Sequence, residues 1–283
     1  MNVFITDAHF LMGHTHHTAG KPCQDYAFAS ASENDAYAIV SDGCSRGGLT
    51  DVGSRIIVLS SAKAIEGSSG LNDKFGPEQI TLVRREAIKQ ASITLGLTQS
   101  DMLATCLYIY LNSEGGFIQI EGDGVVAFKY RNGNLKMIRF DWEDNTPFYP
   151  AYAENPQAFI YTHGNDLTVN RLSKQTWARK STEAFEDLGN EDISLGSGIH
   201  GITIPIKQSE LTELEFVAVF SDGVVQVDGY DWKDVVVELL AFKTSEGEFV
   251  KRRMNRMVQD SSKKGRGPLD DISSAVIKIK MKE

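Results

Sequence analysis

Short apolar runs that lead into an aspartate and a glycine recur along the chain. Residues 38–43 read Ala-Ile-Val-Ser-Asp-Gly, residues 117–124 read Phe-Ile-Gln-Ile-Glu-Gly-Asp-Gly, and residues 216–223 read Phe-Val-Ala-Val-Phe-Ser-Asp-Gly. Such short, strongly apolar runs are typical of strands in the core of a sheet. The pattern therefore predicts three core strands that deliver Asp42, Asp123 and Asp222 to strand ends.

The remaining patterns predict further strands and four helices, in clusters rather than in alternation. Strand-like segments are residues 26–31, 105–111, 125–130, 135–140 and 273–280. Residues 105–140 predict a four-stranded antiparallel meander, whose last turn is Asn132-Gly133. Apolar residues at spacings of three and four predict helices over residues 51–67, from Pro77 to about 95, 231–242 and 246–259. Clustered elements of this kind favour an α+β fold in which two antiparallel sheets lie face to face with helices outside.

Between about residues 141 and 212 the periodic pattern breaks up into Trp, Tyr, Pro and polar residues. We expect a loop-rich insertion there, with an edge strand or two at most. A length of 283 residues suits one domain that carries a large insertion, so we predict a single domain over residues 1–283.

Composition narrows the classes of partner. A net charge of -9 argues against a general binder of nucleic-acid backbones, and no apolar run approaches the roughly 18 residues of a membrane span. The first residues lack a secretory signal, so we expect a cytoplasmic protein with neither a nucleic-acid nor a membrane partner. Cys23, Cys44 and Cys106 form neither an even set nor a CxxC pair, which argues against a disulfide framework and a thiolate zinc site.

A single Asp-Gly pair after a strand is usually a turn, because Asp bonds its own backbone and Gly tolerates positive φ. Three such pairs at the ends of core strands can converge, and converging carboxylates need a cation between them. We therefore predict that Asp42, Asp123 and Asp222 are metal ligands. Asp270 lies at a fourth acidic strand end. Three histidines in the predicted loop over residues 13–25 are explained equally well by a metal site and by a solvated loop.

Six motifs, in this order, resemble those of the metal-dependent serine/threonine protein phosphatases of type 2C, in a divergent, bacterial-type branch. They are Gln24-Asp25-Tyr26, Ser41-Asp42-Gly43, Ala104-Thr105-Cys106, Glu121-Gly122-Asp123-Gly124, Phe220-Ser221-Asp222-Gly223 and Asp270-Asp271-Ile272-Ser273. Each motif is weak alone, but together they span most of the chain.

The resemblance implies an α-β-β-α sandwich with two Mg²⁺ or Mn²⁺ ions between the sheets, and in many members a third, looser ion. In such proteins Asp42 would bridge the two ions, and the carbonyl of Gly43 would bind one of them. Asp222 and Asp270 would hold the other, Asp123 would share the third ion with Asp222, and Asp25 would orient a metal-bound water. A hydroxide that bridges the metals would then attack the phosphorus of phosphoserine or phosphothreonine in a phosphorylated protein substrate.

The chain departs from the family pattern at three points. Gln24 replaces the usual Glu, Cys44 replaces a histidine that is a proposed general acid, and no arginine precedes Asp25 at the usual phosphate-binding position. His16, Lys21 and Arg46 could take over these roles. We predict that His16 and Arg46 are catalytic together with Asp25. The alternatives are a catalytically weak regulatory or sensor module that keeps the fold and a small-molecule phosphomonoesterase.

Overall fold

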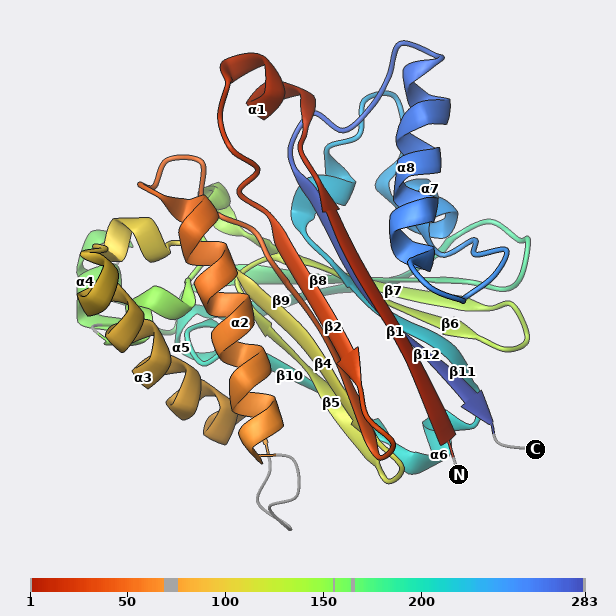
Figure 1. The fold of residues 1–283 in the computed structure, drawn as a ribbon, viewed down its shortest axis with the longest axis horizontal. Helices are drawn as coiled ribbons and strands as arrows, with labels where there is room; N and C mark the ends of the chain where they lie inside the picture. The colour runs from red at the N-terminus through yellow and green to blue at the C-terminus, as the bar shows by residue number, and fades with distance from the viewer. Residues whose placement is uncertain (1, 69–75, 155, 164–165, 282–283) are drawn as a thin grey trace.

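The structure is a computed structural model that describes residues 2–68, 76–154, 156–163 and 166–281. Two antiparallel sheets pack face to face, with helices on both outer faces (Figure 1). This confirms the predicted α+β class and the α-β-β-α sandwich. Among the described residues, no helix combines the length and the apolar character that a membrane span requires.

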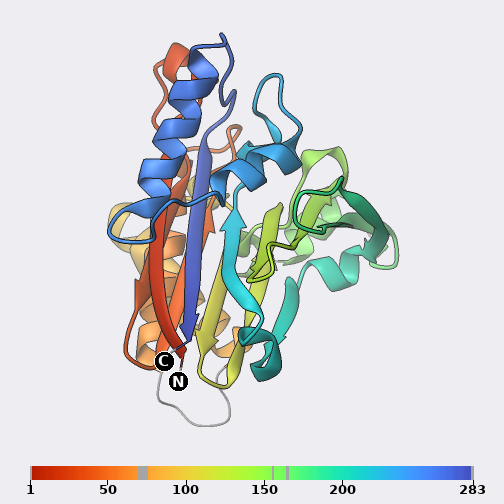
Figure 2. The ribbon, with the colours of Figure 1, turned by 90° about the vertical axis from the view of Figure 1, so that its right-hand side faces the viewer.

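The larger sheet has seven strands. Their order is β1 (Asn2–Leu11), β12 (Ile272–Met281), β11 (Leu214–Phe220), β6 (Gly124–Tyr130), β7 (Leu135–Trp142), β8 (Asn170–Arg179) and β9 (Glu186–Ser194). β1 and β12, the first and last strands along the chain, pair over their whole length, from Asn2 opposite Met281 to Leu11 opposite Ile272 (Figure 2).

The smaller sheet has five strands. Their order is β10 (Ile202–Lys207), β5 (Gly115–Glu121), β4 (Cys106–Asn112), β3 (Asp35–Ser41) and β2 (Tyr26–Ala31). Helices α2 (Thr50–Ser68) and α3 (Pro77–Leu95) pack on this sheet. Helices α7 (Trp232–Leu239) and α8 (Phe249–Ser262) cover the larger one.

Side-chain alternation along the strands builds three apolar layers. On β11, Val217 and Val219 point into the layer between the sheets, whereas Phe216, Ala218 and Phe220 pack against α7 and α8. Successive strand residues face opposite sides of a sheet, and both sides of this sheet are covered here. This double burial explains why the core strands are continuous apolar runs in the sequence.

The four strands predicted over residues 105–140 are present, but they do not form one meander. β4 pairs with β5 in the smaller sheet, and β6 pairs with β7 in the larger one. The chain crosses between the sheets at Gly122 and Asp123. Gly122 has φ 107°, and a Cβ there would lie 2.8 Å from the Cβ of Thr105, so the crossover requires glycine.

The segment over residues 141–212 is more ordered than we expected. It contains the hairpin β8–β9, the edge strand β10, and the short helices α4 (Pro156–His163), α5 (Leu195–Gly198) and α6 (Gln208–Leu211). Most of β9 is exposed to solvent on both faces, and seven of its nine residues are polar or glycine. A strand without a buried face leaves no alternating pattern in the sequence.

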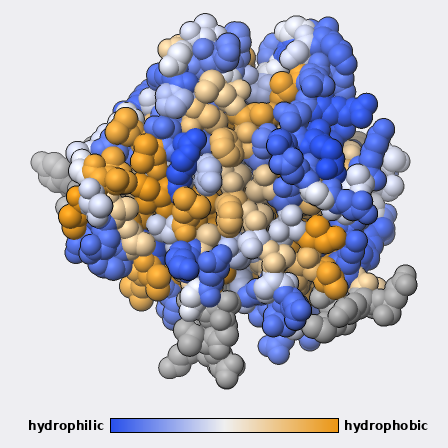
Figure 3. Space-filling view, viewed as in Figure 1, coloured by the Kyte–Doolittle hydropathy of each residue, from blue (hydrophilic) through white to orange (hydrophobic). Residues whose placement is uncertain are grey.

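The N-terminal segment also differs from our expectation. Residues 2–11 form β1, which we did not predict, and the expected loop over residues 13–25 contains the short helix α1 (His14–Ala19). On the outer face of the smaller sheet, apolar side chains remain exposed over α2 and α3 (Figure 3). Leu59, Leu82, Val83, Ile93 and Leu95 are each about half exposed or more.

Candidate metal centre

Antiparallel pairing brings the predicted ligands of the larger sheet to one edge. Phe220, the last residue of β11, lies opposite Ser274 near the start of β12 and opposite Val125 near the start of β6. Asp222 follows β11, Asp270 precedes β12, and Asp123 precedes β6. The three aspartates are distant in the sequence but adjacent at this edge because neighbouring strands run in opposite directions.

The smaller sheet contributes its acids in the same way. Ser41 at the end of β3 pairs with Tyr26 at the start of β2, so Asp42 and Asp25 lie next to each other. The two edges face each other across a cleft with a volume of about 100 Å³. Its walls are Asp42, Gly43, Cys44, Ser45, Arg46, Asp123, Asp144, Asn145, Tyr149, Asp222, Gln226 and Asp270. Six of the eight predicted site residues therefore meet here, whereas His16 and Asp25 do not line the cleft.

Thr105 holds the backbone of Asp42. The N–H of Asp42 donates to Oγ1 of Thr105 at 3.0 Å, and the N–H of Thr105 donates to the carbonyl of Asp42 at 2.8 Å. The hydroxyl of Ser41 also donates to the carbonyl of Thr105. These bonds fix the backbone at the strand end, so the carboxylate of Asp42 is presented to the cleft from a rigid position.

Gly43 is required by the close approach of α2. A Cβ at this position would lie 2.7 Å from the carbonyl oxygen of Thr50 and 2.9 Å from its Cβ. Gln24 stabilises the same contact. Its side-chain amide donates to the hydroxyl of Thr50, and its backbone carbonyl accepts from the N–H of Gly43. The residue that replaces the family's Glu therefore binds the start of α2.

Asp25 lies behind the cleft and links the two sheets. Its Oδ2 accepts a hydrogen bond of 2.6 Å from Ser221, whose hydroxyl in turn accepts from the N–H of Ser273. Its other oxygen, Oδ1, is buried and has no hydrogen-bond partner among the described residues. Burial raises the pKa of Asp25 to about 7, although the hydrogen bond from Ser221 opposes the shift.

Gln226 connects two predicted ligands. Its side-chain amide donates to Oδ2 of Asp222 and to Oδ2 of Asp270, at 3.3 Å in both cases. Gln226 is the C-cap residue of the short 3₁₀ helix Asp222–Val225 and lies four residues after Asp222. A single amide that bridges two carboxylates holds them side by side without a cation.

His16 lies behind Asp270 rather than in the cleft. Its Nδ1 is 2.7 Å from Oδ2 of Asp271, and its Nε2 is 3.9 Å from Oδ1 of Asp270. A carboxylate can only accept, so Nδ1 carries the proton and Nε2 faces Asp270. Asp271 is 1% exposed and also accepts from the N–H groups of Gly13 and Gln24. It thereby fixes both α1 and the segment that carries Asp25.

The cleft concentrates negative charge in a buried place. Burial raises the pKa of Asp42 well above its usual range, and the charges of Asp25 and Asp222 raise it further. Burial followed by the charge of Asp222 raises the pKa of Asp123 in the same way. A bound divalent cation reverses this situation, because it favours the ionised carboxylates.

The donor set fits Mg²⁺ or Mn²⁺. Five aspartates and the backbone around Gly43 line the cleft, and carboxylate and carbonyl oxygens are the ligands that these hard cations prefer. Cations bound at this place would offset the mutual repulsion of the carboxylates. The residues present therefore fit the metal that the motifs imply.

Several residues of the site were not singled out from the sequence. Asp271 was visible only as the second acid of a pair, and Gln226 could have been found from its four-residue spacing after Asp222. Asn145 and Tyr149 lie in the segment without periodic pattern, so no local signal indicated them. Their positions depend on how that segment returns to the cleft.

Comparisons with known proteins agree with this geometry. The family profile described as protein phosphatase 2C matches residues 12–260. A search of curated proteins found no match. Among solved structures, a bacterial serine phosphatase is similar with a TM-score of 0.51 and 12% identity over 98% of each chain.

Two further structures are similar. Serine/threonine phosphatase Stp1 from Staphylococcus aureus has a TM-score of 0.53 and 11% identity, over 99% of this chain and 96% of that one. The phosphatase domain of SpoIIE from Bacillus subtilis, with a fragment of its regulatory domain, has a TM-score of 0.50 and 14% identity, over 98% and 62%. At these identities the likeness shows the fold alone. Because the profile covers most of the chain, the protein belongs to the protein phosphatase 2C family of metal-dependent serine/threonine phosphatases.

Proposed function

We propose that this protein hydrolyses phosphoserine and phosphothreonine in a phosphorylated protein, with Mg²⁺ or Mn²⁺ held in the cleft. The observation that carries the proposal is the convergence of Asp42 from one sheet with Asp123, Asp222 and Asp270 from the other. No predicted ligand is displaced from this group. An arrangement that keeps every ligand supports a working enzyme over a regulatory module that has lost its activity.

Each ligand has a distinct place in the proposed centre. Asp42 would contact both core ions, the backbone of Gly43 would share one of them, and Asp222 and Asp270 would hold the other. Asp123 with Asp222 would hold a third, looser ion. When bound, the ions lower the pKa of a water molecule and offset negative charge on the phosphoryl oxygens. The water oxygen bonds to phosphorus while the bond from phosphorus to the side-chain oxygen of the substrate breaks. That oxygen takes up a proton, and inorganic phosphate is released.

Arg46 is the residue of this chain that we assign to the phosphate. It lies on the cleft wall, its side chain is exposed, and it follows Gly43 by three residues. A guanidinium offers several N–H donors in a planar fork that matches the oxygens of a phosphate. Arg46 can therefore orient the phosphoryl group without holding a metal.

His16 and Asp25 act on the ligands in this proposal. His16 is hydrogen-bonded to Asp271 and faces Asp270, so it positions a ligand and does not reach the leaving group. We propose this positioning role in place of the catalytic role, proton donation or phosphate binding, that the sequence predicts for His16. Asp25, fixed by Ser221 behind Asp42, keeps its second oxygen available for the water or the ion that Asp42 holds.

The test is phosphate release from a phosphothreonine peptide, from para-nitrophenyl phosphate and from sugar phosphates, each with Mn²⁺ and with chelator. We expect Mn²⁺-dependent hydrolysis of the first two, with Asp42→Ala as the inactive control. Absence of all hydrolysis at saturating Mn²⁺ would favour the regulatory module. A preference for sugar phosphates over the peptide would favour the small-molecule phosphomonoesterase.

A further inference from the structure

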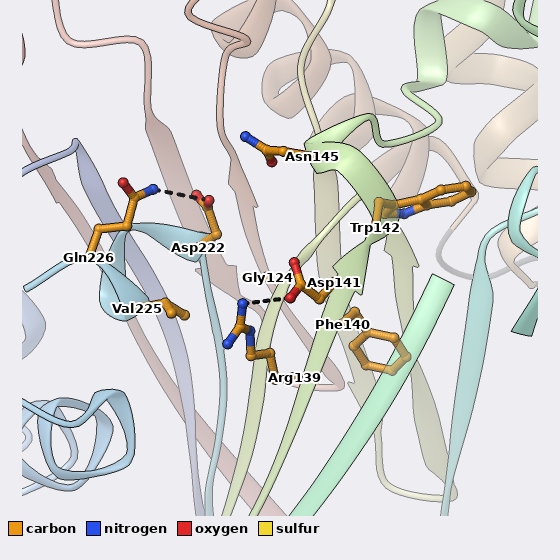
Figure 4. A pocket seen from close by; sticks show the side chains of 9 residues that line it. All are labelled: Gly124, Arg139, Phe140, Asp141, Trp142, Asn145, Asp222, Val225 and Gln226. Carbon is orange, nitrogen blue, oxygen red and sulfur yellow. Dashed lines mark hydrogen bonds and ion pairs between the residues drawn. The ribbon is translucent and has the colours of Figure 1, made fainter. Parts of the chain in front are cut away.

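A second cavity adjoins the metal cleft. It has a volume of about 400 Å³, within the range of ligand sites, and shares Asn145, Asp222 and Gln226 with the cleft. Its remaining walls are Gly124, Arg139, Phe140, Asp141, Trp142 and Val225 (Figure 4). A substrate that places its phosphate in the cleft would therefore extend into this cavity with the groups next to the phosphorylated residue.

Arg139 and Asp141 provide the polar groups of the β7 wall. They are two residues apart on one strand, so their side chains leave the same face of the sheet. Nη2 of Arg139 is 2.6 Å from Oδ2 of Asp141, and Figure 4 shows the pair across the cavity from Asp222 and Gln226. Within the described residues Arg139 makes no other hydrogen bond, although a guanidinium has five N–H donors.

The charge of the pair limits what the cavity can bind well. Arg139 and Asp141 neutralise each other, and Asp222 on the opposite wall would be neutralised by the ion that we assign to it. Neither an acidic nor a basic side chain therefore gains much net attraction. The pair does present a donor and an acceptor next to each other. In an extended chain, the N–H and the C=O of one residue point to the same side, as they do when two antiparallel residues exchange both hydrogen bonds.

Asn145 adds a second polar group at the junction of the two cavities. Asp144 and Asn145 have φ values of 57° and 50°, the left-handed conformation that Asp and Asn tolerate better than most residues. This turn places Asn145 on the wall of both cavities. Consecutive residues in this conformation persist where the surrounding structure imposes them, which is common at binding sites.

We propose that this cavity binds the main chain of the substrate next to its phosphorylated residue. Arg139 donates to the carbonyl of one extended substrate residue, and Asp141 accepts from the N–H of the same residue. The proposal rests on the phosphatase activity proposed above and assigns its substrate class. An enzyme with such a site recognises a polypeptide beside the phosphate with little dependence on neighbouring side chains.

The test compares phosphothreonine peptides with para-nitrophenyl phosphate, which is too small to occupy both cavities. Arg139→Ala should lower kcat/KM for the peptide about 10- to 100-fold more than for para-nitrophenyl phosphate, mainly through KM, because hydrogen bonds to a charged group are lost. Asp141 is 41% exposed, so its carboxylate stays solvated in this variant and the protein should fold. Arg139→Lys, which keeps the charge without the fork, should fall between the two proteins.

Backbone methylation of the peptide tests the role of Asp141. Methylation of one N–H next to the phosphothreonine should weaken hydrolysis by the wild type and have no further effect in Asp141→Ala. Arg256→Ala is the matched control, because Arg256 is 60% exposed, pairs with Asp260 on the same helix and lines neither cavity. It should leave both substrates unaffected.

Three results would overturn the proposal. One is an equal loss on both substrates in Arg139→Ala, and another is a peptide series in which no methylated position matters. The third is a loss in Arg139→Ala that is confined to peptides with an acidic or doubly phosphorylated neighbour, which would assign the cavity to an anion. If the wild type hydrolyses neither substrate with Mn²⁺, the proposed function fails and this inference fails with it.

Discussion

Asp42 and Asp222 combine a fixed backbone with a carboxylate that is unfavourable without a cation. Asp42 directly follows β3, Asp222 lies two residues after the end of β11, and burial raises the pKa of both. Asp42→Ala and Asp222→Ala should each abolish Mn²⁺-dependent hydrolysis of para-nitrophenyl phosphate. The metal-free variants should unfold at the same temperature as the wild type or above it, because one buried charge is removed. Undiminished turnover in either variant at saturating Mn²⁺ would contradict the assignment.

His16 tests whether a residue behind the cleft controls the ligands. His16→Ala removes the group between Asp271 and Asp270, so Mn²⁺ affinity measured by calorimetry should fall about 10- to 100-fold. His16→Asn, which can still donate to Asp271, should recover part of that loss. His17→Ala, an exposed histidine of the same helix, is the control and should bind normally.

The alternative for His16 is proton donation to the leaving group. In that case kcat for a phosphoserine peptide would fall at saturating Mn²⁺ while Mn²⁺ affinity stayed unchanged. para-Nitrophenolate needs no proton to leave, so hydrolysis of its phosphate would be spared. That pattern would restore the role of general acid and refute the positioning role.

Helix α3 is tied to the strand that leads into the metal cleft. Arg84 of α3 is 2% exposed, forms an ion pair with Glu121 at the end of β5, and donates to the sulfur of Cys106 at 3.3 Å. Glu121 precedes Asp123 by two residues. The ion pair therefore joins the helical layer to a predicted ligand through the crossover between the sheets.

Breaking this pair should be costly because it leaves Glu121 charged and almost buried. Arg84→Ala should lower the free energy of unfolding by about 3–5 kcal/mol, measured by denaturant titration. Arg84→Met combined with Glu121→Leu should recover most of the loss. Lys89→Ala, an exposed position on the same helix, should stay within about 0.5 kcal/mol of the wild type. A wild-type stability in Arg84→Ala would show that the pair contributes nothing.

Elements with a buried face were predictable, and elements without one were not. Helix α3 begins at Pro77, and the β6–β7 turn lies at Asn132-Gly133, as predicted, because both rest on strong local preferences. The β8–β9 hairpin has little buried surface, and α1 is only six residues long, so neither produced a periodic pattern. The single meander was wrong because nothing local in residues 105–140 shows that the chain changes sheets.

At the scale of the whole molecule, the predicted ligands meet only because of the register between strands. No local pattern in the sequence shows that register. The Asp-Gly strand ends could be recognised from the residues, and the order of the six motifs along the chain indicated the family. The contacts of His16 with Asp271 and of Gln226 with Asp270 join segments far apart in the chain. Such contacts become visible only when both sheets are assembled.

The assembled cleft should make stability depend on pH and metal together. Because burial raises the pKa of Asp25 to about 7, the folded protein binds more protons than the unfolded chain between about pH 4 and pH 7. Without metal, the free energy of unfolding should therefore fall as pH rises through this window. Mn²⁺ should raise the melting temperature more at pH 7.5 than at pH 5, measured by scanning calorimetry. A metal-free protein that is more stable at pH 7.5 would contradict this expectation.

The most direct test of the central claim is anomalous X-ray diffraction from crystals of the protein soaked in Mn²⁺. We expect two manganese peaks in the cleft, one beside Asp42 and Gly43 and one beside Asp222 and Asp270. Because Asp42 would contact both ions, the first peak should disappear and the second should weaken in Asp42→Ala crystals. A cleft without manganese, or manganese bound only between His16 and Asp271, would contradict the claim that these strand ends form a metal centre.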